Sequence, residues 1–171
     1  MYVWNEFLAW LFSTPKTRPA PRPSVVLAHD GQQCAAFARF IDAWDALVGQ
    51  GAIIESAEPP CWEYRFTGQD RRRGRIERLG ASLWGMDRWA RDPDEPLGEV
   101  FVYMPPPDAA HGPSVFASFG SASQALHNRR RDAERRGERA WAVFEPSGKP
   151  AGRMLQVRVT PPRNVETINT G

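Results

Sequence analysis

The feature of this sequence that most constrains its fold is a regularly punctuated stretch from Pro113 to Val159. The stretch divides into a predicted short strand at 113–119, a basic helix at 121–136, and strands at 140–145 and 153–159. Gly137 and the turn sequence Pro146–Lys149 separate the later pieces. The pattern therefore predicts a strand, a helix and a hairpin in that order, and it indicates architecture rather than chemistry.

The size and composition of the chain fit one soluble globular domain. The chain has 171 residues, of which 42% are hydrophobic and 25% are charged, and this is enough to bury a full core. The net charge is only +2, so binding to nucleic acid or to a membrane would need a local patch. The basic residues are nearly all arginines, and a GC-rich bacterial or phage genome accounts for that bias.

The N-terminal residues 2–12 (YVWNEFLAWLF) are predicted to form a helix that is apolar on almost all sides. This segment is too short to span a bilayer, and it lacks the positive start of a signal peptide. Residues 13–24 hold four prolines and three basic residues, which predicts a semi-rigid linker. The linker favours an arm that docks on a second chain, although packing on its own domain is an alternative. The docking side chains of this arm are Trp4, Phe7, Leu8, Trp10 and Leu11.

The middle of the chain contains further predicted elements. Apolar residues at three- and four-residue steps predict a core helix at 31–48, with a capping box at Asp30 and Gln33. A second basic helix is predicted at 72–91, despite three internal glycines, and Ser121 and Gln124 form a second capping box. The remaining predicted strands are 25–28, 52–57, 62–67 and 99–104, with a surface loop at 105–112.

These elements predict an α+β fold: a largely antiparallel mixed sheet with about three helices, plus the aromatic helix on its Pro-rich linker. The expected division of the chain is an apolar helix at 1–12, a linker at 13–24, one α+β domain at 25–160 and a flexible tail at 161–171. No internal repeat of 20–50 residues is visible.

Enzyme motifs are incomplete in this sequence. Gly148-Lys149 lacks the first glycine and the Ser/Thr of a phosphate-binding loop, and no GxGxxG or HExxH motif occurs. His29 is the best placed acid–base candidate because it ends a predicted buried strand, and Cys61 is a conceivable partner for it. Cys34 and Cys61 form no CxxC pair, which fits a reduced cytoplasmic protein, although a single bridge between them is an alternative. No metal and no cofactor are expected.

Binding signals come from tryptophan and arginine. On the predicted helix 72–91, Trp84, Arg88 and Arg91 lie off the apolar face. An exposed Trp beside arginines suits a protein interface or stacking on bases, and packing on the rim of the core is the third reading. The other arginines of the predicted basic stripe are Arg71, Arg72, Arg73, Arg75, Arg129, Arg130, Arg131 and Arg135.

Three functional hypotheses follow. The leading one is a non-enzymatic protein that binds a protein partner, or another copy of itself, through the N-terminal helix and the Trp84/Arg88 surface. The second is a nucleic-acid-binding accessory protein that uses the arginine stripe. The third is a small enzyme with a site centred on His29. None of the three involves a membrane.

Overall fold

The computed structural model describes residues 23–58, 61–67, 72–84 and 95–163, with ten strands and two helices among them. The strands are β1 (Ser24–His29), β2 (Cys34–Phe37), β3 (Ala52–Glu58), β4 (Cys61–Phe66), β5 (Arg73–Ser82), β6 (Glu99–Met104), β7 (Ser114–Phe116), β8 (Asp132–Arg135), β9 (Ala140–Phe144) and β10 (Pro150–Thr160), and the helices are α2 (Phe40–Gly49) and α4 (Phe119–Asn128). Neither of these two helices is long and apolar enough to cross a membrane.

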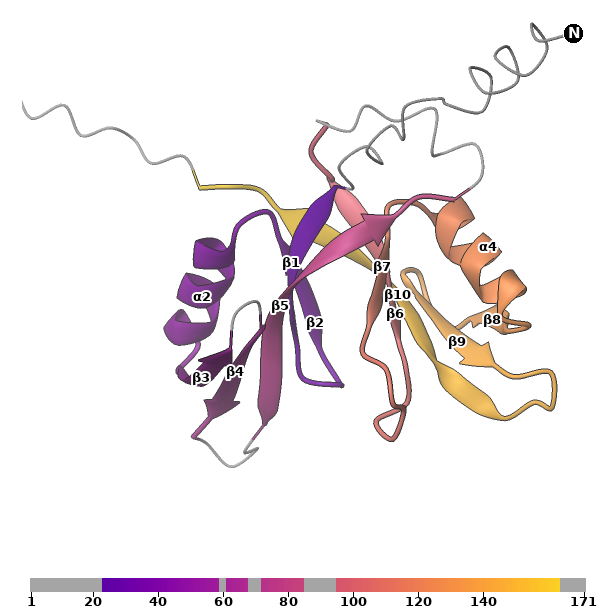
Figure 1. The fold of residues 1–171 in the computed structure, drawn as a ribbon, viewed down its shortest axis with the longest axis horizontal. Helices are drawn as coiled ribbons and strands as arrows, with labels where there is room; N and C mark the ends of the chain where they lie inside the picture. The colour runs from indigo at the N-terminus through magenta and orange to yellow at the C-terminus, as the bar shows by residue number, and fades with distance from the viewer. Residues whose placement is uncertain (1–22, 59–60, 68–71, 85–94, 164–171) are drawn as a thin grey trace, which may run out of the picture.

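Six of the strands close into a barrel in the order β1, β2, β10, β6, β7, β5, because β5 pairs again with β1. Two contacts in the barrel, β2 with β10 and β5 with β7, are parallel, and the other four are antiparallel. The remaining strands extend the sheet outwards as β4–β3 on one side and β9–β8 on the other. Figure 1 shows α2 and α4 at opposite sides of the molecule.

The chain order of the first half, β1-β2-α2-β3-β4-β5, is repeated by the second half, β6-β7-α4-β8-β9-β10. Pairing repeats as well: Ala81 of β5 lies opposite Val115, and Val159 of β10 lies opposite Ala36. Even isolated backbone hydrogen bonds recur, since the Ala81 and Val159 amides donate to the carbonyls that precede β1 and β6, at 2.7 and 2.9 Å. The two halves are therefore related by a pseudo-two-fold axis. Residues with the same pairing in the two halves are called equivalent below.

The sequence repeats weakly where the structure repeats closely. Residues 36–40 read AFARF and the equivalent residues 115–119 read VFASF, at the point where a short strand leads into a helix. Trp62 and Trp141 are also equivalent, and each packs against the first phenylalanine of its helix. The repeat is longer than the 20–50 residues over which the sequence shows none.

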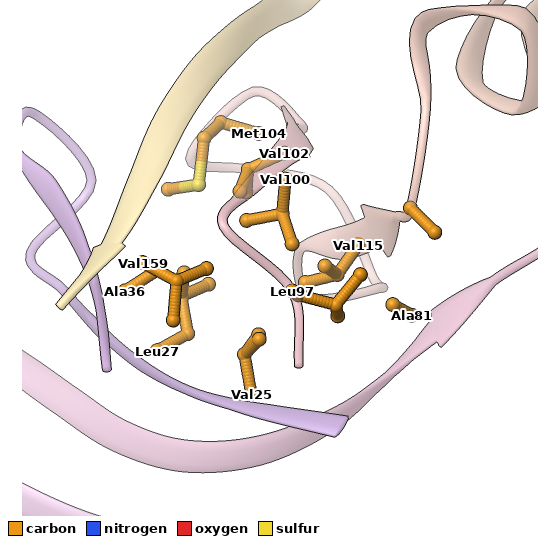
Figure 2. Close-up of a cluster of buried hydrophobic side chains, with 11 residues drawn as sticks. Val25, Leu27, Ala36, Ala81, Leu97, Val100, Val102, Met104, Val115 and Val159 are labelled. Carbon is orange, nitrogen blue, oxygen red and sulfur yellow. The ribbon is translucent and has the colours of Figure 1, made fainter. Parts of the chain in front are cut away.

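The barrel interior is filled by small and branched aliphatic side chains from both halves. They come from alternate residues of the barrel strands, which is the period that places side chains on one face of a strand. Figure 2 shows these side chains converging between the strands. The equivalent pairs are Val25 and Val100, Leu27 and Val102, Ala36 and Val115, and Ala81 and Val159. Full burial of each larger side chain contributes on the order of 1.5–3 kcal/mol.

Each helix covers a second core on the outer face of its own half. A tyrosine ring closes each of these cores over a glycine, Tyr64 over Gly74 and Tyr103 over Gly152, where a Cβ atom would overlap its neighbours. The two tyrosines are not equivalent, because Tyr64 comes from β4 and Tyr103 from β6. Each has a smaller residue at its equivalent position in the other half, Val143 and Ala28 respectively. The halves thus fill similar volumes with rings from different strands.

Several sequence predictions are confirmed. Strands lie where they were predicted at 25–28, 52–57, 62–67, 99–104, 140–145 and 153–159. The predicted strand 113–119 is shorter, at Ser114–Phe116, and Gly148 lies in the predicted turn, where its amide donates to the Glu145 carbonyl at 2.8 Å.

The predicted fold class, however, is wrong. The described chain is mostly β, with a closed six-stranded barrel and two helices, rather than an α+β sheet with about three helices. The predicted helix 31–48 is a strand, β2, followed by α2, which begins at Phe40. Asp30 caps no helix; its Oδ1 accepts from the Gln32 and Gln33 amides in the β1–β2 turn, at 2.9 and 2.7 Å. The strand β2 has only four residues, which is too short to show a clear alternation of apolar and polar side chains. The helical pattern of α2 therefore led to a helix prediction that also included β2.

The predicted helix 72–91 is wrong over residues 73–82, which form the strand β5. Ile76 of this strand faces α2, whereas Leu79 and Ala81 face the barrel interior. Because β5 buries residues on both of its faces, the apolar residues Ile76 and Leu79 are three positions apart, which is also the spacing expected of a helix. Residues 85–91 lie outside the described part of the chain.

The predicted helix 121–136 begins and ends earlier, as α4 at 119–128, and residues 132–135 form β8. Its N-cap is Ser118 rather than Ser121, since the Ser118 hydroxyl accepts from the Ser121 amide at 3.0 Å. The predicted N-terminal helix, most of its linker and the end of the predicted tail (164–171) lie outside the described residues.

The end of α4 generates a stability prediction. Arg130 has φ of 52°, and its equivalent, Gly51, has φ of 87°. A left-handed backbone costs a non-glycine residue about 1 kcal/mol, so Arg130→Gly should raise the unfolding free energy by about that amount. Urea unfolding monitored by tryptophan fluorescence measures the change. Arg129→Gly is the control, because it removes the same charge at a residue with φ of −90°, and it should not stabilise the protein. Equal effects of the two variants would refute the strain argument.

Candidate functional site

Helix α2 carries an apolar surface that the core does not cover. Its inner face is formed by Ala43 and Leu47, which are 0% and 7% exposed. Ile41 and Val48 lie about 100° or more round the helix from these residues, and they are 52% and 48% exposed. Trp44 lies between the two groups and is half-buried. We call Ile41, Trp44 and Val48 the α2 flank.

Packing of a helix on this barrel does not require an apolar flank, as the second half shows. The equivalent positions of α4 hold Gly120, Ser123 and His127, while its inner face keeps the alanines and leucine that α2 also uses. The α2 flank therefore adds apolar area that the fold does not need. Clustered exposed apolar side chains of this kind mark interaction surfaces.

The α2 flank lies on the side of the helix away from β1 and β2. On one side of α2, Ala46 and Gln50 lie beside residues of β1 and β2 around a cavity of about 140 Å³. On the other side, Phe40 packs on Trp62 of β4 and on Trp44, with ring centroids 4.0 and 5.7 Å apart. Because β3 is the neighbour of β4 on this side, the flank is on the side of α2 nearer to the outer strands of the sheet.

Strand β3 is an edge strand: within the described residues it pairs with β4 and with no other strand. Its Ile53 side chain is 44% exposed and faces away from α2, opposite Arg65 in the register. Glu55 forms an ion pair with the same Arg65. The equivalent edge strand β8 differs, since all four of its residues are exposed and three of them, in the sequence DAER, are charged.

Trp84 lies near the start of α4 in the structure. Its amide donates to the Ser121 hydroxyl at 3.0 Å, and its side chain is 41% exposed. Phe119, the first residue of α4, is 46% exposed. Trp84 follows the strand β5, and Arg88 and Arg91 lie outside the described residues.

His29 forms a partly buried pair with a carboxylate at one end of the barrel. Its Nε2 atom lies 2.7 Å from Glu77 Oε1, and the two side chains are 12% and 22% exposed. The equivalent residues in the second half are Met104 and Leu155, which pack against the apolar barrel interior. The polar pair therefore replaces two apolar side chains that the same fold accepts.

The cysteines near this pair are poor nucleophiles. Burial raises the pKa of the Cys34 thiol to about 12. Burial, followed by the Glu77 carboxylate, also raises the pKa of the Cys61 thiol. Both cysteines are free and stay protonated at neutral pH, whereas a nucleophilic cysteine acts as a thiolate. Asp30 is also engaged, since Arg72 lies 3.3 Å from its Oδ2 atom. This arrangement joins His29 and Glu77 by a hydrogen bond, but it brings no activated thiol to them.

The described arginines of the predicted stripe fall into two groups in different halves. In the first half Arg72 pairs with Asp30 and Arg75 with Glu63, each at 3.3 Å, and Arg73 is exposed. In the second half Arg131 contacts Tyr103 and the Ala151 carbonyl, and Arg135 donates to backbone carbonyls of residues 137 and 138. Arg129 and Arg130 are exposed at the end of α4. Figure 1 shows the start of β5 and the α4–β8 region in separate lobes, so one continuous stripe is not formed by these residues.

Arg71, the N-terminal side chains Trp4, Phe7, Leu8, Trp10 and Leu11, and the pair Arg88 and Arg91 lie outside the described residues. Among the residues that are described, no group of three His, Cys, Asp or Glu side chains is placed to hold a metal ion.

Comparison of the chain with protein-family models, with curated proteins and with solved structures finds no match. Within the molecule, the second half is the available comparison for the first. Positions that the fold requires hold similar residues in both halves, and the α2 flank and the His29–Glu77 pair are the clearest departures.

The α2 flank is not apparent from the sequence, where Ile41, Trp44 and Val48 fall within the apolar stripe of a predicted core helix. The signal was present in the width of the stripe. Viewed down the helix axis, Leu47, Phe40, Trp44 and Ile41 follow one another round the circumference. Together they form an apolar stripe that is wider than one packed face requires.

The His29–Glu77 pair generates a stability prediction. His29→Met alone leaves the Glu77 carboxylate partly buried without its partner, which should lower the unfolding free energy by about 1–3 kcal/mol. The double variant His29→Met/Glu77→Leu copies the second half and should recover most of that loss. Urea unfolding of the wild type, both single variants and the double variant measures the coupling. A double variant whose loss equals the sum of the single losses would show that the pair is not coupled.

Proposed function

We propose that this protein is a non-enzymatic interaction protein that binds a protein partner, or a second copy of itself, through the α2 flank. The observation that supports this function most directly is the flank itself, which is apolar and exposed on α2 and absent at the equivalent positions of α4. Aromatic residues dominate the energetics of protein interfaces, and Trp44 lies at the centre of the flank.

Two further surfaces belong to the proposal. The exposed ring of Trp84 is suited to contact a partner near the start of α4. The N-terminal side chains Trp4, Phe7, Leu8, Trp10 and Leu11, and Arg88, keep their proposed role in partner binding. The free thiols of Cys34 and Cys61 favour a reducing, cytoplasmic location for this protein.

Binding is favoured over catalysis by the chemistry around His29. The thiols nearby have raised pKa values, and Asp30 is held by two amides and Arg72. An enzyme centred on His29 would need a nucleophile or a substrate cleft beside the pair, and the described side chains supply no activated nucleophile there.

The α2 flank can be tested by giving it polar side chains like those of α4. The variant Ile41→Ser/Trp44→Ser/Val48→His should abolish association of the full chain, because it removes the apolar contact area. The domain should stay folded, and most of any loss in unfolding free energy should come from Trp44, which packs on Phe40, since Ile41 and Val48 are about half exposed. Light scattering coupled to size exclusion gives the mass. Ser123→Ala, at the exposed α4 position equivalent to Trp44, is the control and should leave the mass unchanged. A triple variant with the wild-type mass would contradict the proposal.

The contribution of the N-terminal segment is tested by deleting residues 1–14. The deletion should abolish the complex and leave a folded domain, as judged by circular dichroism and a cooperative unfolding transition. A truncated chain that fails to fold would instead show that the segment is part of the core.

Nucleic-acid binding is the second candidate function, and a specific surface favours it. Arg130 and Arg131 border an open depression of about 510 Å³ with His127, Asn128, Asp132 and Pro146. Arg129 precedes them at the end of α4, and Arg130 keeps a left-handed backbone that glycine would adopt without strain. A ridge of arginines beside a depression is suited to phosphate contacts.

This second function predicts binding that depends on salt. A short mixed DNA or RNA duplex should bind at low ionic strength and dissociate as salt rises, because phosphate contacts release counterions. Arg129→Gln/Arg130→Gln should weaken binding and reduce the slope of log affinity against log salt by about 1–2. Fluorescence anisotropy measures both quantities, with Arg73→Gln/Arg75→Gln as the control in the other half. Absence of binding at low salt, or binding indifferent to salt, would exclude this function.

A further inference from the structure

The free edge of β3 indicates how the α2 flank is covered. Within the described residues, one row of β3 backbone N–H and C=O groups has no strand beside it. Such an edge is a template for an added strand. The inference that follows rests on the proposed function, because it assigns a partner to the same α2 flank.

The two edges of the sheet differ in what they permit. The residue of β8 equivalent to Ile53 is Asp132, and the whole of β8 is exposed and mostly charged. Charged side chains on an edge strand oppose pairing with another chain. Of the seven β3 residues only two are charged, Glu55 and Glu58, and Arg65 already pairs with Glu55 within the chain. Only the β3 edge is therefore suited to accept a strand.

An added strand at this edge would lie on the same side of the molecule as the α2 flank. Ile41 and Val48 are exposed on the side of α2 away from Gln50 and the cavity beside β1 and β2, and Ile53 is exposed on the face of the sheet opposite α2. A chain docked beside β3 could thus contact apolar side chains of α2 on one face of the sheet and Ile53 on the other. Backbone hydrogen bonds supply affinity in this mode, and the side chains supply selectivity.

We infer that the protein forms a two-fold symmetric dimer in which the β3 edges of two copies pair in an antiparallel manner and the two α2 flanks cover each other. A second copy is the occupant that fits because both surfaces are self-complementary. The backbone edge of β3 pairs with itself when reversed, and the apolar flank meets an apolar flank. Glu55 brings no unpaired like charge to the junction, because Arg65 accompanies it, and Glu58 lies at the far end of β3 from Ile53.

Symmetry also explains why the second edge is charged. A chain with one edge that accepts a strand forms a closed dimer, whereas a chain with two such edges extends into a filament. The charged β8 edge leaves each copy with one pairing edge, and the assembly stops at two copies.

The inference is tested on the full chain with matched variants at equivalent positions. Ile53→Lys places a charge at the dimer junction and should raise the dissociation constant about tenfold or more, because the ammonium group would be buried. Asp132→Lys on β8 is the control and should leave the dimer unchanged. Sedimentation velocity over a range of protein concentrations measures both constants.

A cross-linking measurement reports the geometry directly. With both native cysteines changed to alanine, Ile53→Cys should form a dimer with a short thiol-reactive cross-linker, since the two copies present the same residue across the axis. Asp132→Cys in the same background should remain monomeric on denaturing gels. The inference is supported by a dimeric wild type, a monomeric Ile53→Lys variant and cross-linking at position 53.

Failure of this inference is distinguishable from failure of the proposed function. A monomeric wild type overturns the dimer, as does an Ile53→Lys variant that dimerises like the wild type. In the second case, loss of association by the α2 flank variant would leave the proposed function standing. If neither variant alters association, both the dimer and the flank as a binding surface are refuted.

Discussion

The rest of the structure depends on an exchange of strands between the two halves of the chain. Each half ends in a long strand, β5 or β10, whose final residues pair in parallel with the second strand of the other half. Neither half can therefore close a barrel alone. The aliphatic residues between the strands come from both halves, so the barrel interior is one shared core (Figure 2). Most other features are local additions to this shared centre.

The exchange makes the comparison of the halves informative. Both halves must meet the same geometric demands, and they meet them with AFARF and VFASF before the helices and with Trp62 and Trp141 beside them. Where the volume can be supplied in two ways, the halves differ without consequence, as with Tyr64 and Tyr103. The α2 flank is a different case, because it does not fill a space that another side chain fills in the second half. Its apolar residues therefore call for an explanation other than packing of the fold.

The predictability of this fold from sequence depends on how many faces of an element are buried. Strand β6 was predicted with its observed bounds, because its apolar run is isolated by Gly98 and by the prolines that follow Met104. Strand β5 was mistaken for a helix, because it buries Ile76 against α2 and Ala81 in the barrel. The closure of the barrel depends on pairings between distant segments, which no local pattern carries. For the same reason the α2 flank was counted as core, since the sequence shows which residues are apolar but not which face is covered.

The His29–Glu77 pair shows that the first half also departs from the second inside the barrel. Met104 and Leu155 occupy the same places in the second half and pack with the interior, so an apolar pair is compatible with closure. A partly buried polar pair commonly adds little net stability compared with a packed apolar pair, because desolvation offsets the attraction. Both departures, the polar pair and the apolar α2 flank, thus fall in the half formed by β1–β5 and α2. The second half shows which residues are sufficient for the fold. The first half carries residues at equivalent positions that the fold does not require.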